Sequence, residues 1–368
     1  MLRIVADENI PFLNDFFGHF GEIISLPGRT IQARDLASAD ILLVRSVTKV
    51  NQQLIQDSNV QFVGTCTIGV DHLDLDYLRQ RGIATASAPG CNAGGVVQYV
   101  LSSLARLKPQ WLHAKIGIVG CGNVGGKLYR VLNALGVDVC AFDPFKNNEG
   151  IHWCAWEEVL QCDIICVHTP LTRTGAAPTF HLFDETVLAQ LKPGTLLLNA
   201  GRGEVVDNRA LLNRLQQQHD LTVVLDVWEN EPDILAPLMD FVALGTPHIA
   251  GYSYEGRVNG SLMIHRALGN YLGFDSAALD AHELQVMTKA MGDTEHLNFT
   301  EINSTLLSIY DVAHDDALLR ALIVQDGSSR LGFDLLRKNY PKRRELSHYV
   351  VSPDASSVQS LSALGFSI

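Results

Sequence analysis

The feature that most constrains the fold is a repeated pattern, in which a short apolar run is followed at once by a polar tip containing glycine or proline. The segments "CDIICVHTP", "GTLLLNAGRG", "LTVVLDVW" and "FVALGTPHIAG" show it in succession. Apolar runs of this length, separated by helical patterns, are typical of parallel strands buried between helices. In such sheets ligands bind where the strands end. The pattern therefore predicts an α/β protein whose chemistry lies at the carboxyl ends of its strands.

The alternation of strands and helices occurs in two blocks, which predicts two doubly wound parallel-sheet (Rossmann-like) domains. Residues 1–93 form the first block, and the long helical pattern "NAGGVVQYVLSSLARL" leads into the second, residues 94–255. A helix in "EGRVNGSLMIHRALGNYLGF" is expected to complete the first domain over about 256–280. Strand patterns are fewer beyond this point, so residues 281–368 are expected to form a smaller α+β C-terminal domain.

Composition narrows the class of protein. The chain has 368 residues, of which 47% are hydrophobic and 18% charged, as in a globular protein with a sizeable core. Its formal net charge of -12 argues against a general nucleic-acid binder. The seven cysteines include no CxxC pair, so neither a metal site nor a disulfide framework is expected. No signal peptide or membrane-length apolar stretch occurs, which predicts a cytoplasmic protein without membrane partners.

A glycine loop points to a nucleotide. Gly120, Gly122 and Gly125 form G-x-G-x-x-G between a strand and a helix, which is the context of a dinucleotide-binding fingerprint. The loop with Asn123 and Val124 would receive the pyrophosphate at the helix N-terminus. Asp143, at the end of the next strand, would bind the ribose hydroxyls and repel a 2′-phosphate. This favours NAD over NADP as the cofactor.

Several motifs occur in the order found in one enzyme family. The glycine loop, "HTPLT", "NAGRGEVVD", "DVWENEP" and "TPHIAG" resemble the D-isomer-specific 2-hydroxyacid dehydrogenases, over about residues 1–275. "VRSVTKVN", "GTCTIGVDHLD", "APGCNA" and "FDLLRKNYPKRRE" are most similar to a branch of that family that acts on a phosphorylated acid. The resemblance implies NAD-dependent oxidation of a small phosphorylated 2-hydroxy acid.

Three residues at strand ends are the expected catalytic group. Arg202, held between two glycines, could bind a substrate carboxylate through two parallel hydrogen bonds, which lysine cannot do. His248 is the expected acid/base, because imidazole titrates near neutral pH. Glu231 is expected beside it, where a carboxylate orients the ring and stabilises the imidazolium.

The resemblance also implies a wider set of contacts. On the substrate side it suggests Ser46, Thr67 and Tyr252. On the cofactor side it suggests Thr169, Ala200, Gly201, Arg202, Asp226 and Gly251, with Asp226 accepting a hydrogen bond from the nicotinamide amide.

The C-terminal residues carry a further expectation. Related dehydrogenases are dimers, so residues 281–368 are expected to form a dimerisation domain. The basic cluster of Arg337, Lys338, Lys342, Arg343 and Arg344 could lie near the substrate and select its phosphate. Two alternatives stay open: a dehydrogenase for 3-phosphoglycerate or glycerate, and a non-catalytic NAD-sensing regulator on the same fold.

Overall fold

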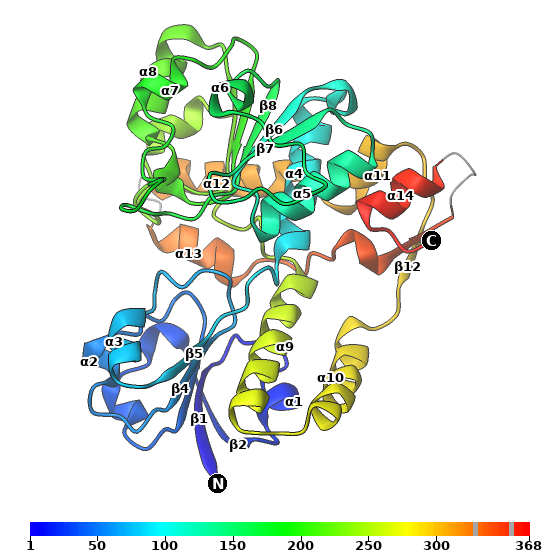
Figure 1. The fold of residues 1–368 in the computed structure, drawn as a ribbon. Coiled ribbons are helices and arrows are strands. Elements are labelled where there is room, and N and C mark those ends of the chain that lie inside the picture. The colour runs from blue at the N-terminus through cyan, green and yellow to red at the C-terminus, as the bar shows by residue number, and fades with distance from the viewer. Residues whose placement is uncertain (327–329, 353–356) are drawn as a thin grey trace. The chain divides into compact units, whose positions relative to one another are not determined.

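The chain folds into two compact units. The computed structural model describes residues 1–326, 330–352 and 357–368 (Figure 1). The first unit contains Met1–Asn92 and Ser253–Asp293, and the second contains Ala93–Tyr252 and Thr294–Ile368. Each unit is built on one parallel sheet, so the predicted fold class is confirmed.

The first unit has a five-stranded parallel sheet in the order β2-β1-β3-β4-β5. This is the doubly wound order in which the chain changes direction between the first and third strands. Its strands are β1 (Leu2–Asp7), β2 (Gly21–Leu26), β3 (Ile41–Val44), β4 (Phe62–Thr65) and β5 (Ala84–Ala86). Its helices are α1 (Leu13–Phe17), α2 (Gln52–Ile55), α3 (Leu75–Gln80), α9 (Tyr254–Tyr271) and α10 (Ser276–Met291). Strand β2 was not predicted from the sequence, because it is a partly exposed edge strand and lacks a continuous apolar run.

The returning helices α9 and α10 belong to the first unit. Helix α9 packs closely on β4, since a Cβ on Gly64 would come within 2.6 Å of Ile264 Cγ2. Helix α10 extends the unit further, to Asp293, because Leu279, Val286 and Ala290 are buried in the same cluster as the residues of α1. The first unit thus continues to Asp293, whereas the sequence analysis placed the end of this segment at about residue 280.

The second unit has a six-stranded parallel sheet in the order β11-β10-β9-β8-β6-β7. Its strands are β6 (Ile116–Val119), β7 (Val139–Phe142), β8 (Ile164–Val167), β9 (Leu196–Asn199), β10 (Thr222–Leu225) and β11 (Leu244–Gly245). Its helices before the C-terminal region are α4 (Ala93–Leu107), α5 (Asn123–Ala134), α6 (Trp156–Val159), α7 (Glu185–Leu188) and α8 (Asn208–Gln218). Strands β6, β8 and β9 are buried throughout, which explains their uninterrupted apolar sequences.

The C-terminal region packs into the second unit. It contains β12 (Glu295–Leu297), α11 (Ile302–Ile309), α12 (Ala313–Asp326), α13 (Arg330–Lys338), β13 (Tyr349–Val351) and α14 (Val358–Leu364). Leu306, Val312 and Leu361 share a hydrophobic core with Val96 and Val100 of α4. The paired strands β12 and β13 agree with the expected α+β character. Contacts therefore give two compact units, where the sequence suggested a separate third domain.

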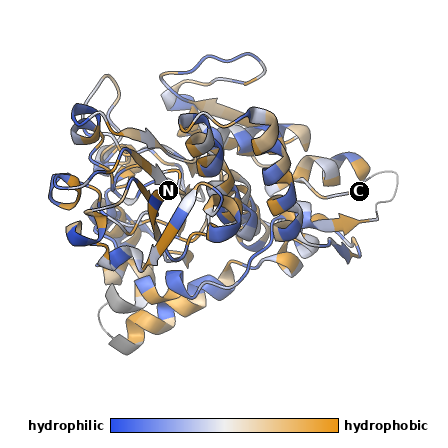
Figure 2. Ribbon diagram, turned by 90° about the horizontal axis from the view of Figure 1, so that it is seen from below, coloured by the Kyte–Doolittle hydropathy of each residue, from blue (hydrophilic) through white to orange (hydrophobic). Residues whose placement is uncertain are grey.

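Many hydrophobic residues of the described helices are buried in these cores. None of those helices combines the length and the apolar character that a bilayer-spanning helix requires. Figure 2 shows orange, hydrophobic stretches on the C-terminal helices α12 and α13. Leu318 and Leu335 on these two helices are 52% and 56% exposed. These helices thus carry apolar side chains on their surface as well as in the core.

Candidate active site

The glycine loop lies at the point where the strand order of the second sheet reverses. The chain leaves β6 through this loop, forms α5, returns to β7 on one side and later to β8 on the other. Gly120 has a φ of 87°, which favours glycine. A Cβ on Gly125 would lie 2.0 Å from the Gly120 carbonyl oxygen, so only glycine lets α5 start this close to the strand. A Cβ on Gly122 would meet nothing within 4 Å, which leaves space in front of the helix N-terminus.

Asn123 and Val124 begin α5 directly after that space, and Asp143 follows β7 beside it. The Asp143 carboxylate accepts hydrogen bonds from the backbone N–H groups of Cys121 (3.0 Å) and Phe145 (3.1 Å). The carboxylate is thereby fixed against the glycine loop. Lys146 Nζ donates to the Cys121 carbonyl at 2.9 Å, so a cation that the sequence analysis overlooked also borders the loop.

Two polar side chains at the end of β8 have no hydrogen-bond partner among the residues that the structure describes. They are the Thr169 hydroxyl and both ring nitrogens of His168, all of them buried. Burial lowers the pKa of His168 to about 4, so the ring is neutral at pH 7. A Cβ on Gly120 would come within 2.8 Å of Thr169 Cγ2, which places these groups against the glycine loop. Buried polar atoms without a partner are unusual in a protein core. Beside a helix N-terminus they could instead bind a dinucleotide.

Arg202 follows β9, and the glycines around it have a packing role. A Cβ on Gly201 would lie 2.8 Å from the Thr169 carbonyl oxygen, and one on Gly203 would lie 1.9 Å from the Trp228 carbonyl oxygen. These glycines let the ends of neighbouring strands come close together. The Arg202 guanidinium is partly buried and donates from Nη1 to the Gly201 carbonyl at 2.9 Å.

His248 and Glu231 are in direct contact. His248 Nδ1 lies 2.7 Å from Glu231 Oε2, and the other carboxylate oxygen accepts the Trp228 backbone N–H at 2.7 Å. Burial alone would raise the pKa of Glu231, but the charge and hydrogen bond of His248, the Trp228 N–H and Arg337 outweigh it and lower the pKa. Glu231 is therefore held as a carboxylate against the imidazole. Since Nδ1 faces Glu231, Nε2 is the nitrogen left for a substrate.

Asp226, at the end of β10, holds the loop that carries His248. Its carboxylate accepts hydrogen bonds from the Thr246 hydroxyl (2.7 Å) and from the backbone N–H groups of Ile249 (2.7 Å) and Ala250 (3.0 Å). The side chain is buried, and burial raises its pKa despite these bonds. The sequence analysis expected Asp226 to face the nicotinamide, whereas its oxygens here are directed to the protein's own loop.

Tyr252 lies just after this loop and contacts an arginine from the C-terminal region. Arg337 Nε donates to the Tyr252 hydroxyl at 3.1 Å, and its guanidinium carbon lies 5.5 Å from the centre of that ring. Its charge also acts on Glu231. The sequence analysis named Arg337 only as one of five clustered cations. The structure places it beside Tyr252, where its charge also reaches Glu231.

Arg343 has a different place from the one expected. It is 6% exposed, and its guanidinium lies 4.3 Å from the Tyr310 ring centre. It donates to the backbone carbonyls of Ile249 and Ala250, directly after His248. The basic cluster is therefore not one surface, and Arg343 supports the His248 loop from within the core. Lys338 and Lys342 are exposed.

The remaining expected residues lie at strand ends of their own sheets. Ala200 and Gly251 follow β9 and β11 in the second unit. Ser46 follows β3 and Thr67 follows β4 in the first unit, at adjacent strands of one sheet. Ser46 is exposed, while the Thr67 hydroxyl is hydrogen-bonded to Thr65 Oγ1 at 2.8 Å and to the Gly69 carbonyl at 3.2 Å.

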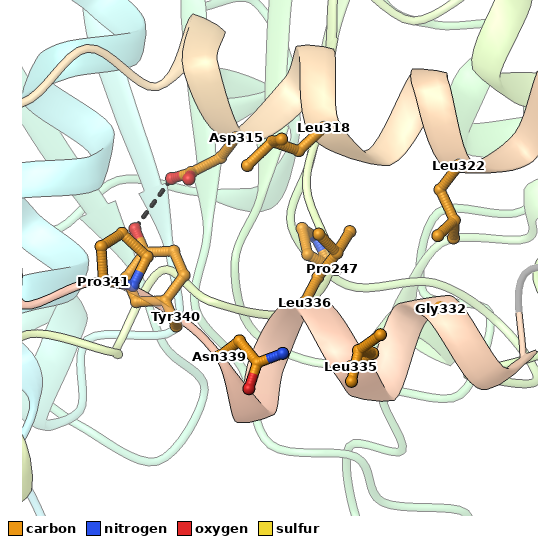
Figure 3. Close-up of a pocket in the computed structure, with 10 residues that line it drawn as sticks. All are labelled: Pro247, Asp315, Leu318, Leu322, Gly332, Leu335, Leu336, Asn339, Tyr340 and Pro341. Carbon is orange, nitrogen blue, oxygen red and sulfur yellow. Dashed lines mark hydrogen bonds between the residues drawn. The ribbon is translucent and has the colours of Figure 1, made fainter.

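An apolar pocket lies between α12 and α13 and includes Pro247, the residue before His248. Figure 3 shows the lining leucines of α12 and α13, with Pro247 drawn between the two helices. Its one carboxylate, Asp315, accepts a hydrogen bond from the Tyr340 hydroxyl at 2.8 Å. Such a lining does not suit a small anionic substrate, which needs cations and hydrogen-bond donors. The pocket is therefore not the binding site that we infer for the substrate.

Comparisons with known proteins agree with this geometry. Residues 100–250 match the family described as D-isomer specific 2-hydroxyacid dehydrogenase, NAD binding domain. Residues 280–365 match a domain of unknown function. Two curated relatives match over the full length. The erythronate-4-phosphate dehydrogenase of Saccharophagus degradans is 54% identical and covers 100% of this chain and 99% of that protein. The chain belongs to the erythronate-4-phosphate dehydrogenase family.

A second member of the erythronate-4-phosphate dehydrogenase family, from Cellvibrio japonicus, is 51% identical over 99% of both chains. Solved structures share the fold at lower identity. A 3-phosphoglycerate dehydrogenase of Entamoeba histolytica has a TM-score of 0.64 at 21% identity, covering 74% of this chain and 95% of its own. A D-lactate dehydrogenase of Aquifex aeolicus has a TM-score of 0.61 at 20% identity, covering 77% and 97%. The chain is thus an NAD-dependent dehydrogenase with its NAD-binding domain in the second unit.

Proposed function

We propose that this protein oxidises 4-phospho-D-erythronate to (R)-3-hydroxy-2-oxo-4-phosphooxybutanoate, an early step in the synthesis of pyridoxal 5′-phosphate. The observation that carries the proposal is the contact of His248 with Glu231 at 2.7 Å, in a chain about 50% identical over its whole length to enzymes named for this substrate. Arg202 ends a neighbouring strand of the same sheet, since β9 pairs with β10.

His248, Glu231 and Arg202 each have a separate role in this reaction. Oxidation of a 2-hydroxy acid removes a hydride from C2 and a proton from the hydroxyl group, and NAD accepts the hydride when it is bound. His248 Nε2 accepts the proton, because Nδ1 is bonded to Glu231. The Glu231 carboxylate stabilises the imidazolium that results. Arg202 binds the substrate carboxylate and holds C2 in place.

A phosphorylated substrate needs a second cation besides Arg202. Arg337 is a candidate, because it lies beside Tyr252 and acts on Glu231. Burial by itself would lower the pKa of Arg337, but Tyr252 and Glu231 raise it, so the guanidinium remains charged. A guanidinium can bind a phosphate dianion through two parallel hydrogen bonds. We therefore propose that Arg337 helps to select the phosphorylated acid.

Replacing Arg337 with glutamine should raise the KM for 4-phosphoerythronate about 10-fold, since one charge-assisted contact is lost. The KM for plain erythronate should change much less. NADH formation would be followed by absorbance with both acids, and with 3-phosphoglycerate and glycerate, for the original protein and the variant. Lys338→Gln is the matched control, because Lys338 is the exposed neighbour on the same helix. Equal effects on both erythronates would leave Arg337 a structural residue. If the original protein preferred 3-phosphoglycerate or glycerate, the proposed substrate would be wrong.

The two alternative functions have weaker support. A regulatory domain built from repeated strand–helix–strand units would suit other dehydrogenases of this family, but the described C-terminal residues are mainly helical. A non-catalytic NAD sensor would not need a carboxylate bonded to a histidine at the carboxyl edge of the sheet. The Glu231–His248 pair therefore favours an enzyme.

We also propose that the protein is a homodimer whose interface includes α12 and α13. Leu318, Val324 and Leu335 on these helices are 52%, 85% and 56% exposed, and exposed apolar groups of this size are typical of interfaces. Light scattering of the full chain should give twice the mass of one chain, and Leu318→Glu with Leu335→Glu should give one. A monomeric original protein, or a dimer that survives both changes, would reject the interface. Deleting residues 280–368 is unsuitable, because it would expose the core of the second unit.

A further inference from the structure

Three histidines far apart in the sequence meet in the first unit. His19 follows α1, His265 lies on α9 and His282 lies on α10, and these helices are neighbours (Figure 1). One ring nitrogen of each lies within 4.8 Å of one from each of the others. The ring centres are 4.2 Å apart for His19 and His282, and 5.3 Å apart for the other two pairs.

Each of these rings already has one nitrogen fixed by a hydrogen bond. His265 Nδ1 lies 2.7 Å from Glu283 Oε1, and His282 Nε2 lies 2.8 Å from the Asp15 carbonyl oxygen. His19 is hydrogen-bonded to the backbone of Phe16. Asp15 and Phe16 are in the last turn of α1, where carbonyls lack helical partners and accept N–H donors. In each ring the N–H then points to an oxygen, and the second nitrogen keeps a lone pair.

In the described part of the chain, the lone pair of His265 has no hydrogen-bond partner. Its Nε2 is buried without a hydrogen bond, and the residue is 0% exposed. Leaving such a nitrogen unpaired in a core is unfavourable. Phe20 and Phe274 pack around the same rings, with centroid distances of 5.1 Å from Phe20 to His265 and 5.8 Å from Phe274 to His19. An aromatic surround of this kind shields a bound ion on most sides, while the exposed His19 leaves a route of entry.

We propose that His19, His265 and His282 bind a divalent transition metal ion, Zn²⁺ by preference, with water as the fourth ligand. Imidazole nitrogens suit zinc, which is held at about 2.0–2.1 Å in a tetrahedral arrangement. That arrangement brings ligand nitrogens to about 3.3 Å from one another, so small side-chain rotations would close the present arrangement. A carboxylate or carbonyl behind each histidine is also the usual support of a metal-bound imidazole. The sequence analysis expected no metal site because the cysteines include no CxxC pair; these three histidines form no local motif in the sequence.

The second group of possible ligands does not carry the same argument. His181, Asp207 and Glu229 also lie close together in the second unit. There His181 Nε2 bonds Glu229 at 2.6 Å and Nδ1 faces Asp207 at 3.5 Å, so both ring nitrogens face carboxylates. The carboxylates serve the protein as well, since Asp207 caps α8 and Glu229 accepts the Asn208 N–H at 2.9 Å. The polar atoms of this second group thus have partners within the protein, so the group does not call for a metal ion.

The test uses the full-length protein after treatment with a chelator. Calorimetric titration with Zn²⁺ should show one ion per chain, and Co²⁺ should give the visible absorption of a tetrahedral site. Saturating Zn²⁺ should raise the melting temperature by about 5 °C, because the ion binds the folded chain and ties α1 to α9 and α10. His19→Gln and His282→Gln should each remove the titration and the shift in melting temperature.

Two further variants make the result specific. His296→Gln removes an exposed histidine elsewhere and should bind Zn²⁺ as the original protein does. His181→Gln tests the other group and should also keep binding. Undiminished binding in both His19→Gln and His282→Gln, or no binding by the original protein, would overturn the site. His19 is exposed, so its replacement should leave the fold intact, and circular dichroism would check this.

Discussion

Replacing His248 with asparagine should lower kcat by about 10²–10⁴-fold, which is the usual contribution of a positioned acid/base group. The backbone at His248 has a φ of 57°, and asparagine adopts this left-handed conformation readily. The loop should therefore keep its shape, and the amide can still reach Glu231. What is lost is the group at Nε2 that accepts the substrate proton. NADH formation measures kcat, and calorimetry measures NAD binding, which should be unchanged.

His219→Asn is the matched control for this change. His219 also has a positive φ, of 48°, but it ends α8 and is not part of the site. Its replacement should leave kcat within about twofold, since surface substitutions rarely change more. Normal turnover by His248→Asn would remove His248 from the mechanism. A parallel loss of NAD binding would mean that the change has disturbed the fold of the second unit.

Replacing Arg202 with lysine should lower kcat/KM about 10²-fold. Lysine keeps the positive charge but offers a single point of contact, so the two parallel hydrogen bonds to the substrate carboxylate are lost. A hydrogen bond to a charged group contributes about 1.5–3 kcal/mol, and a 10²-fold loss of kcat/KM corresponds to about 2.7 kcal/mol, within these limits. Because the carboxylate also orients C2, both kcat and KM should change. Steady-state kinetics over a range of substrate concentrations would separate the two.

The control here is Arg209→Lys, which makes the same change at an exposed position on α8. It should leave kcat/KM close to that of the original protein. An Arg202→Lys variant with equal efficiency would show that the guanidinium geometry has no role. The backbone near Arg202 should tolerate the exchange, because its close packing comes from Gly201 and Gly203 and not from the arginine side chain.

The sheets could be predicted because buried parallel strands leave an apolar run in the sequence. Strands β6, β8 and β9 are such runs, and each was expected. The edge strand β2 was missed because half-buried strands lack this signal. The place of the C-terminal region could not be predicted either. Contacts such as Gln98 to the Arg344 carbonyl span 246 residues and leave no local pattern.

The candidate site was predictable to the extent that strand ends meet at one edge of a sheet. The sequence placed Glu231 and His248 together, and the structure has them in contact at 2.7 Å. It did not reveal that Asp226 is bonded to the backbone of the His248 loop, since a strand-end carboxylate can face either way. The contact of Arg337 with Tyr252 could not be predicted either, because the sequence does not show which residue of the basic cluster is buried. The catalytic roles themselves remain predictions.

The anchoring of the His248 loop by Arg343 has a consequence for how the enzyme is made. On the ribosome the chain emerges from its N-terminus, so Arg343 appears 93 residues after Ala250, whose carbonyl it binds. A nascent chain can therefore complete the six-stranded sheet and display Arg202, Glu231 and His248 while the loop after His248 still lacks its guanidinium. Such a chain also lacks Arg337. We therefore expect turnover only after Arg337 and Arg343 have been synthesised.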